Sequence, residues 1–519
     1  MTSPWKLLAA ALCLSLMSPA CTSKNRLEGY LYQRLNADPT TLDPAFIVDV
    51  TGGSIAAKLF NGLVRLDPDL NIVPDIAGKW DIRDSGKVYT FYLNRGVRFF
   101  NGREVTAEDF RFSFRRILHP LTRSPNTWVF DSILGAEEFM KGQTADVRGI
   151  EVLDAYTLRI TLRRSFAPFM NLLTMTAAYV VPGEEIERKG PEFSFRPVGT
   201  GPFILKSWEH NTELALKANE GYFAGPPKIR GIIYRVIPED LTAVTEFELG
   251  NLDVIAVPAY EFARYSRSQE WQGLISSGRG LNTYYLGFNC SRPPFDDAAL
   301  RRAVAGAIDR EKILATFYEK RGRIARGPVP DLLRQWDAPA LHPYDPAKSM
   351  AVIDGSGIKS RVVTFYVNAD QEVIDLAEII QSYLKTAGIT VAIKQLEWSA
   401  FKSAINKGEA DMFWLSWWAD YPDPENFLFP LFHSSNHGPS GNRARYTNRE
   451  VDRLIEAGQR TPDRSLRNQY YMKAERIIAE ESPWVFFWHK TDFIVKQQQV
   501  KDHRIYPIYT IDKGTGVSF

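Results

Sequence analysis

Three apolar strand segments alternate with two helical segments between residues 362 and 418, and this alternation constrains the fold more than any other part of the chain. The predicted elements are strand 362–367, helix 372–386, strand 389–393, helix 399–407 and strand 412–418. A glycine follows each predicted helix, as is typical of a helix C-terminus. A βαβαβ order requires parallel strands joined by right-handed crossovers. We therefore expect an α/β fold with a parallel sheet in this half of the chain.

A weaker βαβ pattern occurs earlier in the chain. It consists of strand 232–237, helix 241–249 and strand 254–257. Residues 250–253 and 408–411 share the pattern Gly-x-x-Asp and occupy equivalent places, between the last helix and the last strand of each unit. Two α/β lobes are the natural inference, and a cleft between two lobes is a common place for a ligand.

Strand alternation and turn residues predict further elements outside these two units. The additional strands are 88–93, 157–162 and 213–217, and residues 149–162 are predicted to form a hairpin that turns at 154–155. Thr106 and Asp109 form a variant of the capping box, which predicts the start of a helix. Phe110, Phe114 and Ile117 would form the apolar face of this helix.

The segment after strand 412–418 is the predicted ligand position on topological grounds alone. In open parallel sheets, ligands bind beyond the carboxyl ends of the strands. Residues 419–424 follow this strand, and two prolines end regular structure there. Asp420 therefore lies where a ligand is expected. The alternative is that Asp420 caps a turn before Pro422, a common role for aspartate.

The N-terminus has the pattern of an export signal. Residues 7–17 form an uncharged apolar run after Lys6, and this run is too short to span a bilayer, which takes about 20 residues. Ser18, Pro19 and Ala20 precede Cys21, which resembles the lipobox of bacterial lipoproteins, whose cysteine is acylated after cleavage. Residues 1–21 are thus predicted to be a signal peptide with a lipobox, and Cys21 a lipidation site. Cleavage by ordinary signal peptidase without lipidation is the alternative.

Charge and cysteine content exclude several classes of protein. The 519 residues include 63 basic and 61 acidic side chains, and no clustered run of one sign occurs. A nucleic-acid partner is therefore not expected, because such proteins carry a clustered basic face. Of the three cysteines, only Cys290 lies in the body of the chain, which leaves no pair for a structural disulfide and no cysteine-rich metal site.

Motifs of catalysis and cofactor binding are also missing from the sequence. His433 and His437 are spaced like zinc ligands, but no glutamate follows His433 as the zinc-protease pattern requires. Residues 199–202 contain two glycines but not the third glycine of a dinucleotide-binding loop. No phosphate-binding loop or Gly-x-Ser-x-Gly segment occurs. We therefore expect no catalytic residues, no metal and no cofactor.

A series of short motifs extends along most of the chain. They are LDP at 42–44, LFNGL at 59–63, VPDIA at 73–77 with Trp80, FFNG at 99–102 with TAEDF at 106–110, PVGTGPF at 197–203, Phe288-Asn289 with Pro294-Phe295 and Arg301, and WADY at 418–421. This ordered set resembles the family of bacterial extracellular solute-binding proteins that serve oligopeptide and dipeptide ABC importers. The likeness covers nearly everything from residue 30 to residue 500.

The resemblance implies a two-lobed periplasmic-binding-protein fold with a third domain added to the first lobe. The first lobe would be discontinuous and comprise residues 27–60, 190–288 and 485–519. The extra domain would comprise residues 61–189, and the second lobe residues 289–484. This division agrees with the two α/β units inferred from the strand and helix patterns.

The resemblance also assigns a role to Asp420. In peptide-binding members, the aspartate of this segment pairs with the α-ammonium group of the ligand. The pairing is physically reasonable, because a buried ammonium requires a buried counter-charge. Residues 414–418 would offer a strand edge to the extended backbone of the peptide, a mode of binding that ignores side-chain identity.

Four aromatic residues are further candidates for ligand contacts. Trp414 and Trp418 face the same way by strand alternation. Trp398 matches another cleft position of the family, and Tyr285 lies in the segment that enters the second lobe. Ordinary core packing is the alternative for each of these side chains.

One departure from the family pattern leaves the ligand open. Oligopeptide binders use two arginines to hold the ligand carboxylate, and here Trp414 and Ile405 occupy those positions. Arg443 is another basic residue that this role could use. The predicted function is a monomeric ABC-importer receptor that binds short peptides, delivers them to the permease subunits and is lipid-anchored at the periplasmic cell envelope. The alternatives are the same fold with a nickel chelate, sugar, opine or haem as ligand, and an exported hydrolase.

Overall fold

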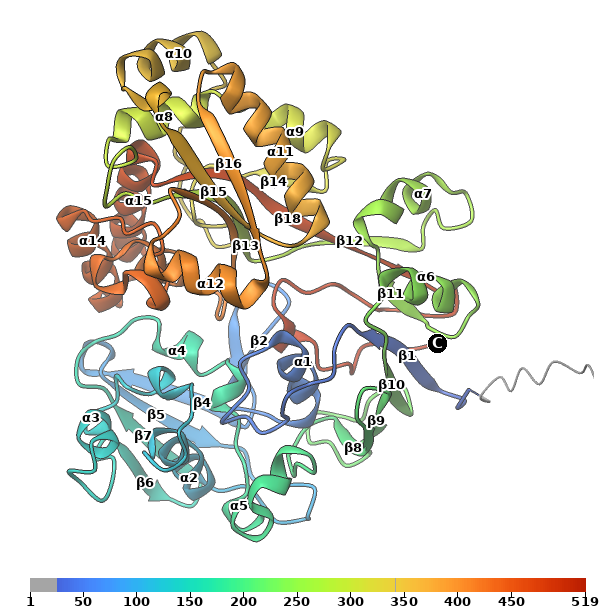
Figure 1. Ribbon diagram of the computed structural model, residues 1–519. Coiled ribbons are helices and arrows are strands. Elements are labelled where there is room, and N and C mark those ends of the chain that lie inside the picture. Colours follow the sequence, from blue (N-terminus) through green and yellow to red (C-terminus); the bar gives the residue numbers. More distant parts are fainter. Residues whose placement is uncertain (1–25, 341) are drawn as a thin grey trace, which may run out of the picture.

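A twelve-stranded mixed sheet forms the centre of the protein in the computed structural model, which describes residues 26–340 and 342–519 (Figure 1). Its main path runs through β16 (Thr390–Leu396), β15 (Val362–Asn368), β17 (Met412–Trp418), β13 (Asn282–Phe288), β18 (Trp484–Lys496), β11 (Val254–Ala256), β1 (Tyr30–Leu35), β10 (Gly231–Val236), β9 (Glu213–Ala218) and β8 (Phe203–Glu209). Two short strands, β12 (Ile275–Arg279) and β14 (Gly322–Ile324), also pair with β18. The predicted signal peptide and Cys21 lie outside the described residues.

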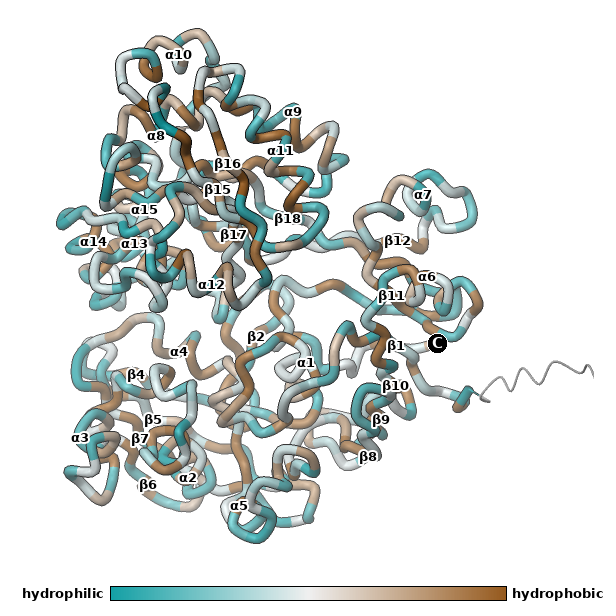
Figure 2. The backbone as a smooth tube through the Cα atoms, in the orientation of Figure 1, coloured by the Kyte–Doolittle hydropathy of each residue, from teal (hydrophilic) through white to brown (hydrophobic). Residues whose placement is uncertain are grey.

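The βαβαβ prediction is confirmed in the second lobe. Strand β15 pairs in parallel with both β16 and β17, and the connections contain α11 (Gln371–Thr386) and α12 (Trp398–Lys407). Asp370 begins α11 because its side chain accepts a hydrogen bond from the amide of Val373, and Gly408 ends α12 at a φ of 75°. In Figure 2, apolar residues occur along the strands of this lobe, and its helices carry both apolar and polar residues.

The βαβ unit of the first lobe is also confirmed, and it shares one detail with the second. Strand β1 pairs in parallel with β10 and β11, which are connected by α6 (Asp240–Glu248). Asp253 accepts a hydrogen bond of 2.7 Å from the amide of Tyr32, and Asp411 accepts one of 2.9 Å from the amide of Thr364. The two Gly-x-x-Asp segments are therefore equivalent in three dimensions, because each aspartate binds the backbone of the adjacent parallel strand.

A single long strand connects the two lobes. Strand β18 pairs with β13 of the second lobe through Trp484–Trp488 and with β11 of the first lobe through Ile494–Lys496. The first part of β18 is buried, whereas residues 490–494 are only half-buried. Figure 1 shows this strand running from the second lobe towards β11 and β12. The lobes are thus joined along β18, and the short segment between β12 and β13 is a second covalent connection between them.

A separate four-stranded antiparallel sheet forms the extra domain. Its order is β4 (Ala77–Arg83), β5 (Val88–Leu93), β7 (Thr157–Thr161) and β6 (Ile150–Asp154), and β6 and β7 form the predicted hairpin. Helix α2 (Ala107–Leu118) begins with the predicted capping box, and Phe110, Phe114 and Ile117 are all buried. The sequence prediction for this region is confirmed.

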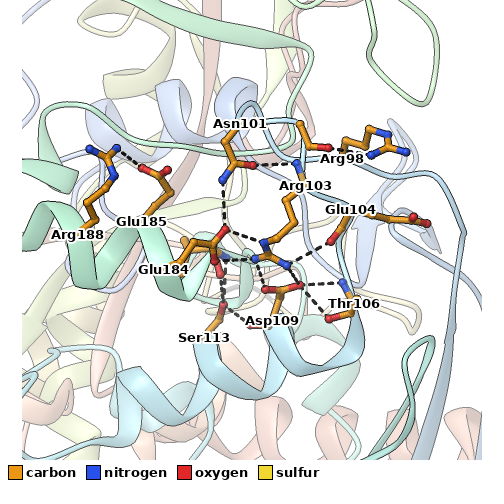
Figure 3. Close-up of polar contacts among 12 residues, drawn as sticks. Arg98, Asn101, Arg103, Glu104, Thr106, Asp109, Ser113, Glu184, Glu185 and Arg188 are labelled. Atoms are coloured by element: carbon orange, nitrogen blue, oxygen red, sulfur yellow. Dashed lines mark hydrogen bonds and ion pairs between the residues drawn. The ribbon is translucent and has the colours of Figure 1, made fainter.

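The FFNG and TAEDF motifs form a polar cluster at the start of α2. Figure 3 shows Arg103 between Asp109 and Glu184, with ion pairs of 2.6 Å to both carboxylates. Asp109 also accepts a hydrogen bond of 2.8 Å from the amide of Thr106, and Asn101 donates one of 3.2 Å to Glu184. These motifs therefore stabilise the extra domain, because they connect α2 to α5 (Gly183–Lys189).

Asp411 is expected to contribute strongly to the stability of the second lobe. Its carboxylate accepts hydrogen bonds from the amide and hydroxyl of Thr364 and forms an ion pair of 3.1 Å with Arg292. Asp411→Ala should lower the free energy of unfolding by about 2–4 kcal/mol, because buried donors lose a charged partner. Urea unfolding measures this change. Glu409→Ala, at an exposed position two residues earlier, is the matched control, and equal unfolding midpoints for the two variants would contradict this account.

Candidate functional site

One edge of β17 has no strand partner along most of its length. Pairing between β15 and β17 covers only Met412 and Phe413, whereas β13 pairs with β17 as far as Trp418. Within the described chain, no strand pairs with the other edge of residues 414–418. Unpaired amide and carbonyl groups at a sheet edge can bind an additional extended chain.

A cavity of about 270 Å³ lies beside this free edge, at the carboxyl ends of β15 and β16. Five aromatic residues line it: Tyr284, Tyr318, Trp398, Trp414 and Trp488. Its polar lining includes Ser416, Asp370, Glu372 and Lys490. The position agrees with the topological expectation for an open parallel sheet, in which the strands end at the ligand.

The structure brings Trp414 and Trp398 together at this cavity. Trp414 is 4% exposed, and its ring centroid lies 5.7 Å from that of Trp488 and 6.3 Å from that of Tyr284. Trp398 begins α12, is 52% exposed and lies with its ring 5.3 Å from the ammonium of Lys402. Trp414 therefore packs in the core and also lines the cavity. The side chain of Trp398 leaves a large apolar surface exposed to solvent.

Trp418 and Tyr285 lie in different environments. Trp418 is 42% exposed and packs edge-on against Tyr284, with ring centroids 6.4 Å apart. Tyr285 is completely buried and stacks on Trp484 at a centroid distance of 3.3 Å. Adjacent strand residues face opposite sides of a sheet. Of these two neighbours, Tyr284 therefore lines the cavity, although it was not among the predicted site residues, and Tyr285 offers a ligand no accessible surface.

Asp420 lies two residues beyond the end of β17 and does not line the cavity itself. Its side chain is exposed, and its carboxylate accepts one hydrogen bond of 3.3 Å from Asn426 in α13 (Glu425–Phe432). Among the described residues, no cation pairs with this carboxylate. Surrounding protein partly displaces water from it and raises its pKa above the ordinary value of 3.8. A positively charged partner would stabilise the charged form of this carboxylate.

Asp423 rather than Asp420 caps the turn after β17. The carboxylate of Asp423 accepts a hydrogen bond of 2.9 Å from the amide of Glu425 and forms an ion pair with Arg467 in α15 (Arg464–Glu481). Asn171 of α4 (Phe169–Leu172), in the extra domain, donates a further bond of 2.9 Å to Asp423. These contacts fix the loop that carries Asp420. No local sequence pattern indicates these contacts, because the partners are distant in the sequence.

Two basic residues near the site differ in their access to a ligand. Arg443 is buried and donates a hydrogen bond of 3.0 Å to Asn406, and it does not line the cavity. Lys490 of β18 does line the cavity and has no ion-pair partner within 4.0 Å in the described part of the chain. Lys490 is therefore better placed than Arg443 to meet a ligand carboxylate, and no local sequence pattern indicates this.

No group of three or more potential metal ligands occurs among the residues that the structure describes. Cys290 is a free cysteine, and burial raises the pKa of its thiol to about 12, so the reactive thiolate is disfavoured. In the same part of the chain, no helix is long and apolar enough to cross a bilayer.

The match to a known family agrees with this geometry. Residues 71–439 match the family described as bacterial extracellular solute-binding proteins, family 5 Middle. The chain therefore belongs to the family 5 extracellular solute-binding proteins. This is a family of binding proteins, and the resemblance seen in the sequence motifs is confirmed.

Relatives in this family are named for different ligands. Di/tripeptide-binding protein 2 of Pseudomonas aeruginosa (strain UCBPP-PA14) is 28% identical over 499 residues, which are 92% of each chain. Heme-binding protein A of Haemophilus influenzae is 28% identical over 505 residues, 92% of this chain and 90% of that protein. The solved structure of the Escherichia coli murein tripeptide binding protein MppA is similar, with a TM-score of 0.79 and 25% identity over 94% of this chain and 99% of that chain. The two-lobed fold with an extra domain is thereby confirmed.

Glu425 makes the stability of the loop after β17 dependent on pH. Its carboxyl group is buried between Tyr421 and Gln459, and burial raises its pKa from 4.5 to about 7. Because the folded state holds this proton more tightly than the unfolded state, the stabilisation is complete below pH 4.5 and is lost as pH rises through 7. The loss from this group is about 3 kcal/mol.

Glu425→Gln should remove this part of the pH dependence, because the amide does not titrate. Urea unfolding at pH 4.5 and pH 8 would compare the wild type, Glu425→Gln and the exposed control Glu409→Gln. We expect the wild type and the control to lose about 3 kcal/mol more between the two pH values than Glu425→Gln does. The same pH dependence in all three proteins would show that Glu425 is not the titrating group.

Proposed function

We propose that this protein is the substrate-binding receptor of an ABC importer and captures short peptides by their N-terminal ammonium groups. One observation carries the proposal: the free edge of β17 leads directly to the carboxylate of Asp420, which pairs with no cation among the described residues. An extended peptide needs hydrogen bonds for its backbone and a counter-charge for its ammonium group, and this arrangement offers both. The peptide-binding relatives of similar length support the same conclusion.

The free edge sets the length of peptide that fits. Residues 414–418 span roughly 16 Å at about 3.3 Å per residue, so the free edge can pair with at most about five extended residues. A peptide whose ammonium lies at Asp420 and whose backbone pairs with β17 would pass Trp418 and reach the aromatic cavity beside Trp414. The backbone contacts are independent of side-chain identity, and the cavity would accept one apolar or aromatic side chain.

Lys490 is proposed to receive the negative end of the ligand. Trp414 and Ile405 replace the two arginines that hold the carboxylate in oligopeptide binders, and Ile405 is buried in the core. Lys490 lines the cavity and is the cationic group there without an ion-pair partner in the described chain. A single ammonium donor holds a carboxylate less rigidly than two arginines, so the C-terminal end of the ligand should contribute less than its N-terminal end.

A non-peptide solute is the second candidate, and the aromatic cavity favours it. Five aromatic rings around one cavity suit a flat apolar ligand, and one relative is named for binding haem. A nickel chelate, a sugar or an opine would use the same fold. Such ligands need no α-ammonium, so they would not depend on Asp420. Turnover of a bound solute would support an exported hydrolase instead.

We propose that export and a lipid anchor hold the receptor at the periplasmic side of the cell envelope. The apolar run at residues 7–17 and the lipobox-like sequence before Cys21 support this assignment. The mature receptor would act as a monomer and deliver its ligand to permease subunits. Its extra domain would comprise residues 61–189. The bounds predicted from the sequence give the first lobe residues 27–60, 190–288 and 485–519 and the second lobe residues 289–484, but β13 and residues 485–488 of β18 pair within the sheet of the second lobe, so we propose to assign them to that lobe.

Asp420→Asn should weaken the binding of free peptides by about 10- to 100-fold, because the substitution removes one charge-assisted hydrogen bond. N-acetylated versions of the same peptides should bind weakly to both proteins and should lose little more affinity in the variant. Calorimetry with the free and N-acetylated forms of one tripeptide measures both effects, and its C-amidated form measures the smaller contribution expected from the C-terminal carboxylate.

The control for this experiment is Asp354→Asn, which changes an exposed carboxylate on α10 (Pro346–Gly355). It should bind free peptides as the wild type does. Equal affinities for free and N-acetylated peptide in the wild type would remove Asp420 from its proposed role. Binding of a haem or sugar with no effect of Asp420→Asn would favour the non-peptide alternative.

Cys21→Ala should release the protein from membranes without unfolding it, because the acyl anchor lies on the N-terminal segment outside the proposed lobes. Fractionation of cells that express each form tests this expectation, and circular dichroism of the released form checks its folding. A variant that stays in the membrane fraction as the wild type does would show that Cys21 does not carry the anchor.

A further inference from the structure

A second cavity of about 270 Å³ lies next to the C-terminal segment of the chain. It is lined by residues 502–504 and 511–517, by Arg65 of β2 (Val64–Leu66) and by Tyr222. None of its lining residues belongs to the aromatic cavity beside β17. This cavity is therefore a separate feature, and the proposed peptide receptor does not account for it.

The side chains around this second cavity include two cations without partners. Arg65 and Arg504 are both exposed, and neither guanidinium forms an ion pair or a side-chain hydrogen bond within the described chain. Lys513 adds a third positive charge, which is buried and donates a hydrogen bond of 2.7 Å to the carbonyl of Phe60. Arginine pairs well with carboxylate and phosphate because its planar group presents several donors.

His503 also lines the second cavity. The amide nitrogen of Gln33 lies 2.9 Å from Nε2 of His503, and an amide nitrogen can only donate. Nε2 therefore accepts, and in the neutral ring Nδ1 carries the proton. Burial lowers the pKa of His503, which favours this neutral form. Nδ1 is buried and has no hydrogen-bond partner.

The backbone at the C-terminus adds unpaired amides. Gly514 has a φ of 70°, and the amides of Thr515 and Gly516 make no hydrogen bond to described residues. The acidic lining groups are mostly occupied: Asp512 forms an ion pair of 3.0 Å with Lys58, and Asp502 lies 4.0 Å from Lys228. Successive free amides beside cations form a common anion-binding arrangement.

We propose that this second cavity binds a small oxyanion, a carboxylate or a phosphate group, through Arg65, Arg504 and the amides of residues 515 and 516. A ligand that only accepts hydrogen bonds would satisfy these donors together. The site is independent of the peptide site.

Titration of the purified mature protein with inorganic phosphate, and separately with succinate and glycerol 3-phosphate, tests the proposal by calorimetry at low salt. We expect saturable binding at one site for at least one of these anions. Arg65→Gln and Arg504→Gln should each weaken it about tenfold or more, and added sodium chloride should weaken it further. Tighter binding of the two phosphate compounds would identify a phosphate group as the preferred ligand, and tighter binding of succinate would identify a carboxylate.

Two control variants make the outcome decisive. Arg453→Gln, on the exposed face of α14 (Arg449–Arg460), should leave anion binding unchanged. Asp420→Asn should also leave it unchanged, because the peptide site is separate. No saturable binding of any of the three anions to the wild type would overturn the proposal, as would equal affinities in the wild type, Arg65→Gln and Arg504→Gln. Loss of anion binding in Asp420→Asn would assign the response to the peptide site instead.

Discussion

The hydrogen bonding of β18 is the constraint on which the rest of the structure depends. This one strand pairs with β13 in the second lobe and with β11 in the first, so the two lobes share a sheet. Its buried first half fixes the strand order of the second lobe, and its half-buried residues 490–494 lie where the partner strand changes. Relative motion of the lobes would concentrate there, because a few residues at an element junction can absorb a hinge rotation. Lys490 lies at this junction and also lines the aromatic cavity.

The position of the candidate site follows from the parallel sheet. Strands β15 and β16 end together, β17 continues beyond its pairing with β15, and a cavity remains where the two connecting helices begin. The loop after β17 then places Asp420 outside the strand, and the contacts of Asp423 with Arg467 and Asn171 hold that loop in place. The loop thus holds the carboxylate of Asp420 in place, and no described residue supplies a cation to it. This is the arrangement that a positively charged ligand group requires.

Local sequence patterns predicted the elements well and the tertiary contacts less well. The βαβαβ order, the hairpin at 149–162 and the helix start at Thr106 were all predictable, because hydrophobic periodicity and capping residues act over short distances. Alternation also placed Trp414 on the face of β17 that meets the cavity. Periodicity could not decide between Tyr284 and Tyr285, since a one-residue change reverses the face and both residues are aromatic. Lys490 and Asn171 were not predictable, because they reach the site from elements far away in the sequence.

The central claim is that Asp420 binds the α-ammonium of an extended peptide whose backbone pairs with β17. A crystal structure of the mature protein with a bound tripeptide tests this claim most directly. The account predicts that the α-nitrogen of the peptide lies about 2.7–2.9 Å from a carboxylate oxygen of Asp420, and that backbone groups of the peptide form hydrogen bonds with residues 414–418. A tripeptide bound with its α-nitrogen away from Asp420, or one that makes no backbone hydrogen bonds with β17, would contradict it.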